Sequence, residues 1–215
     1  MSVSTVAARW GARGRDDLAD GSGPAVLAAV DDRVAWLSGR SSPTRTALSP
    51  AEDALLDAAA RHGFVPLRRG FPFVGTGPWE PVPLARASVR NARQYLALRH
   101  DPATRALVAP LLRPLFATTR SRLLVVCGSL GLELLAAGLP EPGDAPRPRL
   151  RVVALGPVAG RVPAGLDVWV AQGRLDPISA LGYRGEVRVR PWCGHLGYRG
   201  PAVERLVEDA CRSPW

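Results

Sequence analysis

The sequence contains no lysine, so each of its 28 basic residues is an arginine. With 19 acidic residues the formal net charge is +9, a balance that often indicates a nucleic-acid or membrane-surface partner. The arginines are scattered along the chain, however, and form no basic block. Absence of lysine beside abundant alanine, glycine and proline is typical of a GC-rich coding bias. We therefore interpret the charge as a solvated surface and do not expect nucleic acid as a partner.

Cysteine is also scarce, and its number and spacing do not suggest a disulfide framework. Cys127, Cys193 and Cys211 are odd in number and form no C-x-x-C pair, which is typical of reduced intracellular thiols. The N-terminus lacks the sustained apolar segment of a signal peptide, and no stretch approaches the length needed to span a membrane. We expect a soluble, cytoplasmic protein with no membrane partner.

Apolar residues, in contrast, are plentiful. They make up 47% of the 215 residues, enough for one well-buried core. Residues 1–24 are rich in Gly, Ser, Asp and Arg, so we predict a loosely ordered N-terminal arm there. A single domain is predicted over residues 25–215.

Strand-like and helix-like segments alternate along that domain. Ser49-Pro50-Ala51-Glu52 is a capping box with proline at the first helical position, a clear helix start. Alternation of strands and helices predicts an α/β fold with a mainly parallel sheet flanked by helices. The expected strands cover residues 33–39, 64–69, 123–128, 150–155, 167–172 and 186–190, the last as an edge strand. The expected helices cover residues 50–62, 87–98, 103–117, 131–138 and 202–211. An irregular loop is expected over residues 70–83 and a Pro-rich linker over residues 140–148.

The stretch from Leu123 to Leu135 reads as a strand, a very tight turn and a helix, with Ser129 at the apex. Cys127-Gly128-Ser129-Leu130-Gly131 matches the G-x-S-x-G nucleophile elbow except at its first position, where the small residue Cys replaces Gly. Such a turn projects the serine hydroxyl away from the backbone, and the next N–H, that of Leu130, can face a developing oxyanion. Two other interpretations stay open: Ser129 as a plain helix cap, or a glycine-rich turn that binds a dinucleotide.

A serine hydroxyl becomes a good nucleophile only when a histidine accepts its proton and an acid orients that histidine. His62 and His100 each lie at a predicted helix end, where a cation is favourable. His195, in a Gly-His-Leu-Gly loop beyond the last predicted strand, is therefore the candidate base. Asp176 follows another predicted strand and is the candidate acid, with a turn before Pro177 as the structural alternative. Parallel sheets place their chemistry at these strand ends.

The chain from about Val34 to its end resembles the α/β-hydrolase family, through its elbow serine, its Gly-Arg-Leu-Asp-Pro-Ile stretch and its Gly-His-Leu loop. The resemblance implies a three-layer sandwich and a compact member without a large cap domain. It also implies a second oxyanion donor in the loop after an early strand. Here that loop is Ser38-Gly39-Arg40-Ser41, so Gly39 or Arg40 is the expected donor, although the family's usual His-Gly is absent.

The activity implied is that of a serine hydrolase acting on a carboxylic ester or an acyl thioester, without metal or organic cofactor. Its substrate would be a small acyl compound, free or bound to coenzyme A or to a carrier protein, which a basic surface favours. Phe71, Phe73 and Trp79 are candidates for an apolar acyl pocket and equally for ordinary core. Four alternatives stay open: acyl transfer or cyclisation with the same triad, a non-catalytic binding domain, a nucleotide-binding Rossmann-like domain and, on the ground of charge alone, a nucleic-acid binder.

Overall fold

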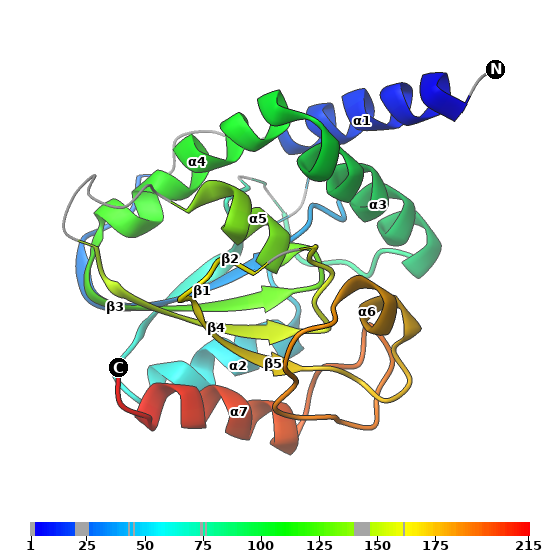
Figure 1. Ribbon diagram of the computed structural model, residues 1–215. Helices are drawn as coiled ribbons and strands as arrows, with labels where there is room; N and C mark the ends of the chain where they lie inside the picture. The colour runs from blue at the N-terminus through cyan, green and yellow to red at the C-terminus, as the bar shows by residue number, and fades with distance from the viewer. Residues whose placement is uncertain are drawn as a thin grey trace.

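The computed structural model describes residues 3–19, 26–42, 44, 46–73, 75, 77–139, 147–160 and 162–215. Five parallel strands form one sheet in the order β2-β1-β3-β4-β5, with helices on both faces (Figure 1). The strands are β1 (Val30–Ser38), β2 (Val65–Phe71), β3 (Thr119–Gly128), β4 (Arg149–Leu155) and β5 (Asp167–Ala171). The helices in the described ranges are α1 (Val3–Ala19), α2 (Pro50–Ala60), α3 (Leu84–His100), α4 (Pro102–Ala117), α5 (Gly131–Gly138), α6 (Pro177–Gly182) and α7 (Pro201–Arg212).

Two hydrophobic layers sandwich the sheet. Helices α3, α4 and α5 cover one face, while α2 and α7 cover the other (Figure 1). Successive residues of β3 serve the two layers in turn: Val125 and Cys127 belong to one core, Leu124 and Val126 to the other. Because both faces are buried, the central strands are continuous apolar runs rather than alternating ones. The predicted α/β fold with a parallel sheet in a three-layer sandwich is confirmed.

The local signal at the start of α2 is also confirmed. The Ser49 hydroxyl accepts a hydrogen bond from the backbone N–H of Glu52 (3.2 Å), and the Glu52 carboxylate accepts one from the N–H of Ser49 (2.7 Å). Pro50 occupies the first helical position, where its missing N–H costs nothing. This cap fixes the point at which the chain enters the helix beside β1.

The loosely ordered arm predicted over residues 1–24 is wrong for Val3–Ala19, which form α1. This helix packs along α3, and its Leu18 is 1% exposed. A Cβ at Gly14 would lie 2.2 Å from the carbonyl oxygen of Arg93, so this glycine allows the two helices to approach closely. Charged residues that contributed to the prediction of a loosely ordered arm make tertiary contacts instead, as in the ion pair between Asp17 and Arg90.

The C-terminal third differs from the prediction in two respects. The edge strand expected over 186–190 is wrong, because only one isolated bridge joins Val189 to Ala171. Pro191 follows and lacks the N–H needed to continue a ladder. Helix α6 was not predicted; it is a short helix after Pro177. Most of the linker predicted over 140–148 lies outside the described residues.

No helix within the described ranges combines the length and the apolar character needed to cross a bilayer.

Candidate active site

Ser129 lies between the end of β3 and the start of α5, in a backbone conformation that few residues other than glycine adopt. Its φ is +49°, in the left-handed region. Two hydrogen bonds hold this strained residue: its N–H donates to the carbonyl of Leu155 (3.1 Å), and its own carbonyl accepts from the N–H of Val158 (2.9 Å). The surrounding structure therefore enforces a turn that exposes the Ser129 side chain at the strand end.

Close packing explains the small residues around the turn. A Cβ at Gly128 would lie 2.7 Å from the Trp36 ring, and one at Gly131 would lie 2.0 Å from the carbonyl oxygen of Leu37. Cys127 fits where the motif has glycine because its side chain points into the core beneath α5. Burial raises the pKa of this thiol, which makes it a packing residue rather than a reactive one.

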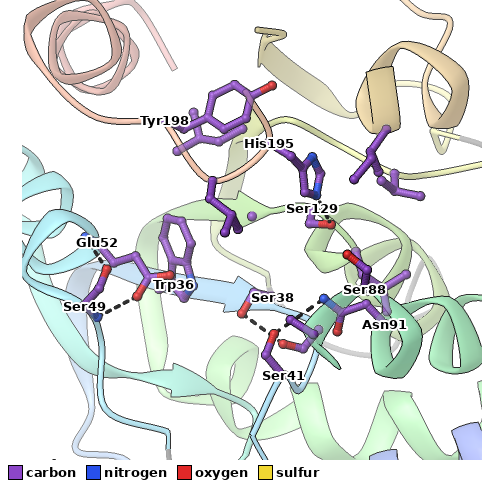
Figure 2. A pocket seen from close by; sticks show the side chains of 18 of the residues that line it. Trp36, Ser38, Ser41, Ser49, Glu52, Ser88, Asn91, Ser129, His195 and Tyr198 are labelled. Atoms are coloured by element: carbon purple, nitrogen blue, oxygen red, sulfur yellow. Dashed lines mark hydrogen bonds between the residues drawn. The ribbon is translucent and has the colours of Figure 1, made fainter. Parts of the chain in front are cut away.

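The structure brings Ser129, His195 and Asp176 together, as Figure 2 shows for the serine and the histidine. The Nε2 atom of His195 lies 2.9 Å from the Ser129 hydroxyl oxygen. The Nδ1 atom lies 3.0 and 2.9 Å from the two carboxylate oxygens of Asp176. With the ring proton on Nδ1, the histidine donates to Asp176 and its Nε2 is free to accept the serine proton.

The Asp176 carboxylate is buried, with 2% of the residue exposed, and its hydrogen-bonding capacity is well filled. Besides His195, its Oδ1 accepts from the backbone N–H of Ser179 (2.9 Å), and its Oδ2 accepts from the hydroxyl of Tyr198 (2.5 Å). The bond from Ser179 makes Asp176 the N-cap of α6. The turn proposed as an alternative for this residue is therefore present together with its contact to His195.

A cavity of about 800 Å³ opens at Ser129 and His195. Much of its wall is apolar, while Ser88 and Asn91 of α3 supply polar groups (Figure 2). The buried Oδ1 atom of Asn91 has no hydrogen-bond partner within the described residues. The apolar lining includes Trp36, Trp79, Leu130, Val158, Ile178 and Leu196.

Of the expected oxyanion donors, Leu130 and Gly39 line this cavity. Arg40 is a correction: its backbone N–H donates to the side-chain oxygen of Gln94 (2.9 Å), and the Gln94 amide donates back to the Arg40 carbonyl (2.9 Å). Gln94 is fully buried, so this pair is a fixed part of the packing. The N–H of Arg40 is therefore not available to a substrate.

Of the three aromatic residues considered for the acyl pocket, one lines it. Trp79 is 44% exposed and forms part of the cavity wall. The assignment of Phe71 and Phe73 to the pocket is wrong, since they are 0% and 3% exposed and belong to the core between the sheet and its helices. The guanidinium of Arg40 packs over the Phe73 ring, 5.7 Å from its centroid.

Tyr198 was missed by the sequence analysis. It follows His195 by three residues, and no spacing rule connects a tyrosine there to the acid; its contacts with Asp176 and Gly173 exist only in the folded chain. Asn91 was also missed, because α3 carries no motif that would point to it. Within the described ranges, no group of three or more His, Cys, Asp or Glu side chains is placed to hold a metal ion.

No protein-family model and no curated protein matches this sequence. Among solved structures, the chain is similar to esterase PE8, with 17% identity and a TM-score of 0.51 over 86% of this chain and 95% of that one. A protein from Silicibacter sp. TM1040, provisionally described as a thioesterase, matches with 12% identity and a TM-score of 0.44 over 98% and 90% of the two chains. The first likeness shows a shared fold, and the second is too weak to add to it.

Proposed function

We propose that this protein is a serine hydrolase that cleaves carboxylic esters or acyl thioesters with Ser129, His195 and Asp176. The observation that carries the proposal is the continuous hydrogen-bond chain from the Ser129 hydroxyl through both nitrogens of His195 to the buried Asp176 carboxylate. A helix cap or a dinucleotide-binding turn needs no histidine on the serine. The esterase fold of a solved structure is consistent with the proposal and is not its basis.

In the first half-reaction, the Ser129 oxygen attacks the acyl carbon while His195 Nε2 takes the serine proton. Negative charge then develops on the former carbonyl oxygen, and the N–H groups of Leu130 and Gly39 are the proposed donors to it. Asp176 stabilises the imidazolium that forms. His195 returns its proton to the leaving alcohol or thiol as the carbon–oxygen or carbon–sulfur bond breaks, which leaves the acyl group on Ser129.

In the second half-reaction, water replaces the alcohol or thiol. His195 removes a proton from the water, whose oxygen attacks the acyl-serine carbon. Collapse of the second tetrahedral intermediate returns the proton to Ser129 and releases the carboxylic acid. The apolar cavity wall suits an aliphatic or aromatic acyl group.

The test is steady-state hydrolysis of p-nitrophenyl esters and acyl-coenzyme A thioesters by the wild type, Ser129→Ala and Asp176→Asn. We expect Ser129→Ala to lower kcat by about 1,000-fold or more. Ser121→Ala is the matched control, since Ser121 is exposed at the opposite end of β3. Undiminished turnover by Ser129→Ala would contradict the proposal, as would a folded wild type that binds acyl compounds and cleaves none of them.

A further inference from the structure

We propose that Tyr198 is a positioning residue that tunes His195 as a base by holding the Oδ2 atom of Asp176. The inference rests on the proposed function and adds a fourth side chain to its hydrogen-bond chain. The Tyr198 hydroxyl donates to Asp176 Oδ2 at 2.5 Å, the shorter end of the range for a hydroxyl bonded to a carboxylate. The same hydroxyl accepts from the backbone N–H of Gly173 at 2.7 Å.

The Gly173 contact fixes which way the phenol proton points. A hydroxyl that accepts a backbone N–H directs its own proton elsewhere, and here the carboxylate is the acceptor within reach. The phenol therefore donates to Asp176 and does not compete with it for the histidine proton. Burial and the neighbouring Asp176 raise the pKa of Tyr198 well above its usual range, so the donor keeps its proton under working conditions.

Close packing fixes the Tyr198 ring, in addition to the hydrogen bonds that fix its hydroxyl. A Cβ at Gly156 would lie 2.5 Å from the Tyr198 ring, so any residue larger than glycine there would displace the tyrosine. Gly156 has a φ of +55° and follows β4, while Gly173 follows β5. Tyr198 thus spans from the His195 loop to the ends of two strands, and it ties the position of the acid to that of the base.

The chemical consequence concerns the charge on Asp176. A charge-assisted hydrogen bond from a phenol draws electron density from the carboxylate, which weakens its pull on the imidazolium. Tyr198 should therefore temper the preference of Asp176 for a charged imidazole while it holds the carboxylate against Nδ1 of His195, which keeps Nε2 available as a proton acceptor. Among the described residues, three other titratable groups lie near these hydrogen-bonded side chains. Cys193 lies beside Asp176 and Tyr198, and Glu52 and Arg199 lie on the cavity wall.

The experiment is the pH profile of kcat/KM for a p-nitrophenyl ester with the wild type and Tyr198→Phe. The active fraction is counted with a fluorophosphonate, and the melting temperature is measured alongside. We expect kcat/KM on the high-pH plateau to fall by about ten-fold, because Asp176 is no longer held in the orientation that Nδ1 of His195 requires. The acid limb of the kcat/KM profile should move to higher pH, because an Asp176 carboxylate without the phenol favours the charged imidazole more strongly.

Tyr183→Phe is the matched control. Tyr183 is 8% exposed, and its hydroxyl donates to the carbonyl of Glu186 at 3.3 Å, outside the cavity lining. Its acid limb should stay at the wild-type position. If Tyr198→Phe does not fold, Tyr198→3-fluorotyrosine replaces it; this stronger donor should move the limb to lower pH.

Several results would overturn the inference. An active wild type whose acid limb does not move in Tyr198→Phe or Tyr198→3-fluorotyrosine would show that the tyrosine does not act on His195. An equal loss of activity at every pH with a lower melting temperature would assign it a purely structural role. A folded wild type that neither hydrolyses esters nor reacts with the fluorophosphonate would instead remove the proposed function, and this inference with it.

Discussion

Asp176 uses its two carboxylate oxygens for different purposes. Oδ1 caps α6 through the N–H of Ser179, while Oδ2 takes the Tyr198 hydroxyl, and both lie within hydrogen-bond distance of His195 Nδ1. The cap and the phenol fix the carboxylate from both sides, so it cannot rotate without breaking a bond. At the scale of one residue, the turn that begins α6 is also what orients the acid.

At Glu52, burial and hydrogen bonding act on the carboxyl pKa in opposite directions. It closes the capping box of α2 and also lines the cavity, and burial raises the pKa of its carboxyl above the ordinary value despite the opposing bonds from Ser49. A folded-state pKa above the unfolded one means that the folded protein binds more protons between the two values. The contribution of Glu52 to the free energy of unfolding therefore falls as pH rises through that interval.

We predict that Glu52→Gln, which keeps an acceptor for the Ser49 N–H and removes the ionisable group, gains stability relative to wild type as pH rises. The measurement is denaturant unfolding of both proteins at about pH 4 and about pH 7. The difference between variant and wild type should be more favourable to the variant at the higher pH. A difference that moves the other way would mean that the bonds from Ser49 outweigh burial.

Sequence patterns single out candidate residues where a local motif or elimination points to them, and they miss residues whose contacts arise only in the folded chain. Ser129 was predicted because a tight strand-to-helix turn leaves a local signature of small residues. His195 followed by elimination among three histidines. Arg40 and Tyr198 could not be judged in this way, because their roles are decided by Gln94, 54 positions away, and Asp176, 22 positions away.

Among the elements, the junction of β3 with α5 is tightly constrained. Its signal was readable because close packing imposes the glycines: Gly131 lies against the backbone of Leu37, and Gly128 lies against the Trp36 ring. The strand expected over 186–190 failed for the opposite reason: an alternating pattern fits a strand, but pairing is limited to one bridge before Pro191. Helix α1 was missed because the partners of its charged residues lie on α3 and at Asp101, between α3 and α4.

Gly131→Ala should lower the free energy of unfolding by about 2–3 kcal/mol, because its Cβ would lie 2.0 Å from the carbonyl oxygen of Leu37. Urea denaturation provides the measurement. Gly11→Ala, on α1, is the matched control, since no neighbouring atom lies within 4 Å of a Cβ placed at Gly11. Alanine at this position should leave the free energy of unfolding unchanged or raise it by up to about 1 kcal/mol. Wild-type stability in Gly131→Ala would be incompatible with the close approach of α5 to β1.

For α1, the predicted outcome is that Leu18→Ala destabilises the whole domain by about 2–4 kcal/mol, because the side chain is 1% exposed. The same truncation at Leu181, which is 78% exposed on α6, should change stability by less than about 0.5 kcal/mol. Cooperative unfolding followed by circular dichroism measures both. Equal stability of Leu18→Ala and wild type would mean that α1 is not part of the folded unit.

At the scale of the whole molecule, the fold is simpler to anticipate than the surface. Near-continuous apolar strands alternating with helices require a sheet covered on both faces, and the five-stranded parallel sheet meets that requirement. The arginines hold distant segments together in many places, for example Arg122 on Asp32 and Arg151 on Asp167. Part of the charge that composition assigned to a solvated surface is thus structural.

The remaining positive charge leads to a prediction about substrate. Arg199 lies on the cavity wall, and the chain carries a net charge of +9. Long-range electrostatic attraction should therefore favour an anionic acyl donor. We predict that kcat/KM for an acyl-coenzyme A falls several-fold when NaCl rises from about 20 to about 200 mM, whereas that for a neutral p-nitrophenyl ester stays constant. Identical salt dependence for the two substrates would leave the net charge without a role in recognition.

The central claim is that Ser129 is an activated nucleophile, and covalent labelling tests it most directly. The purified wild type, Ser129→Ala, His195→Ala and the control Ser121→Ala are treated with a fluorophosphonate, and the adduct is located by peptide mass spectrometry. The account predicts one adduct, on Ser129, in the wild type and in Ser121→Ala, and none in the other two variants. A folded wild type that takes no label, or label that persists in Ser129→Ala, would contradict it.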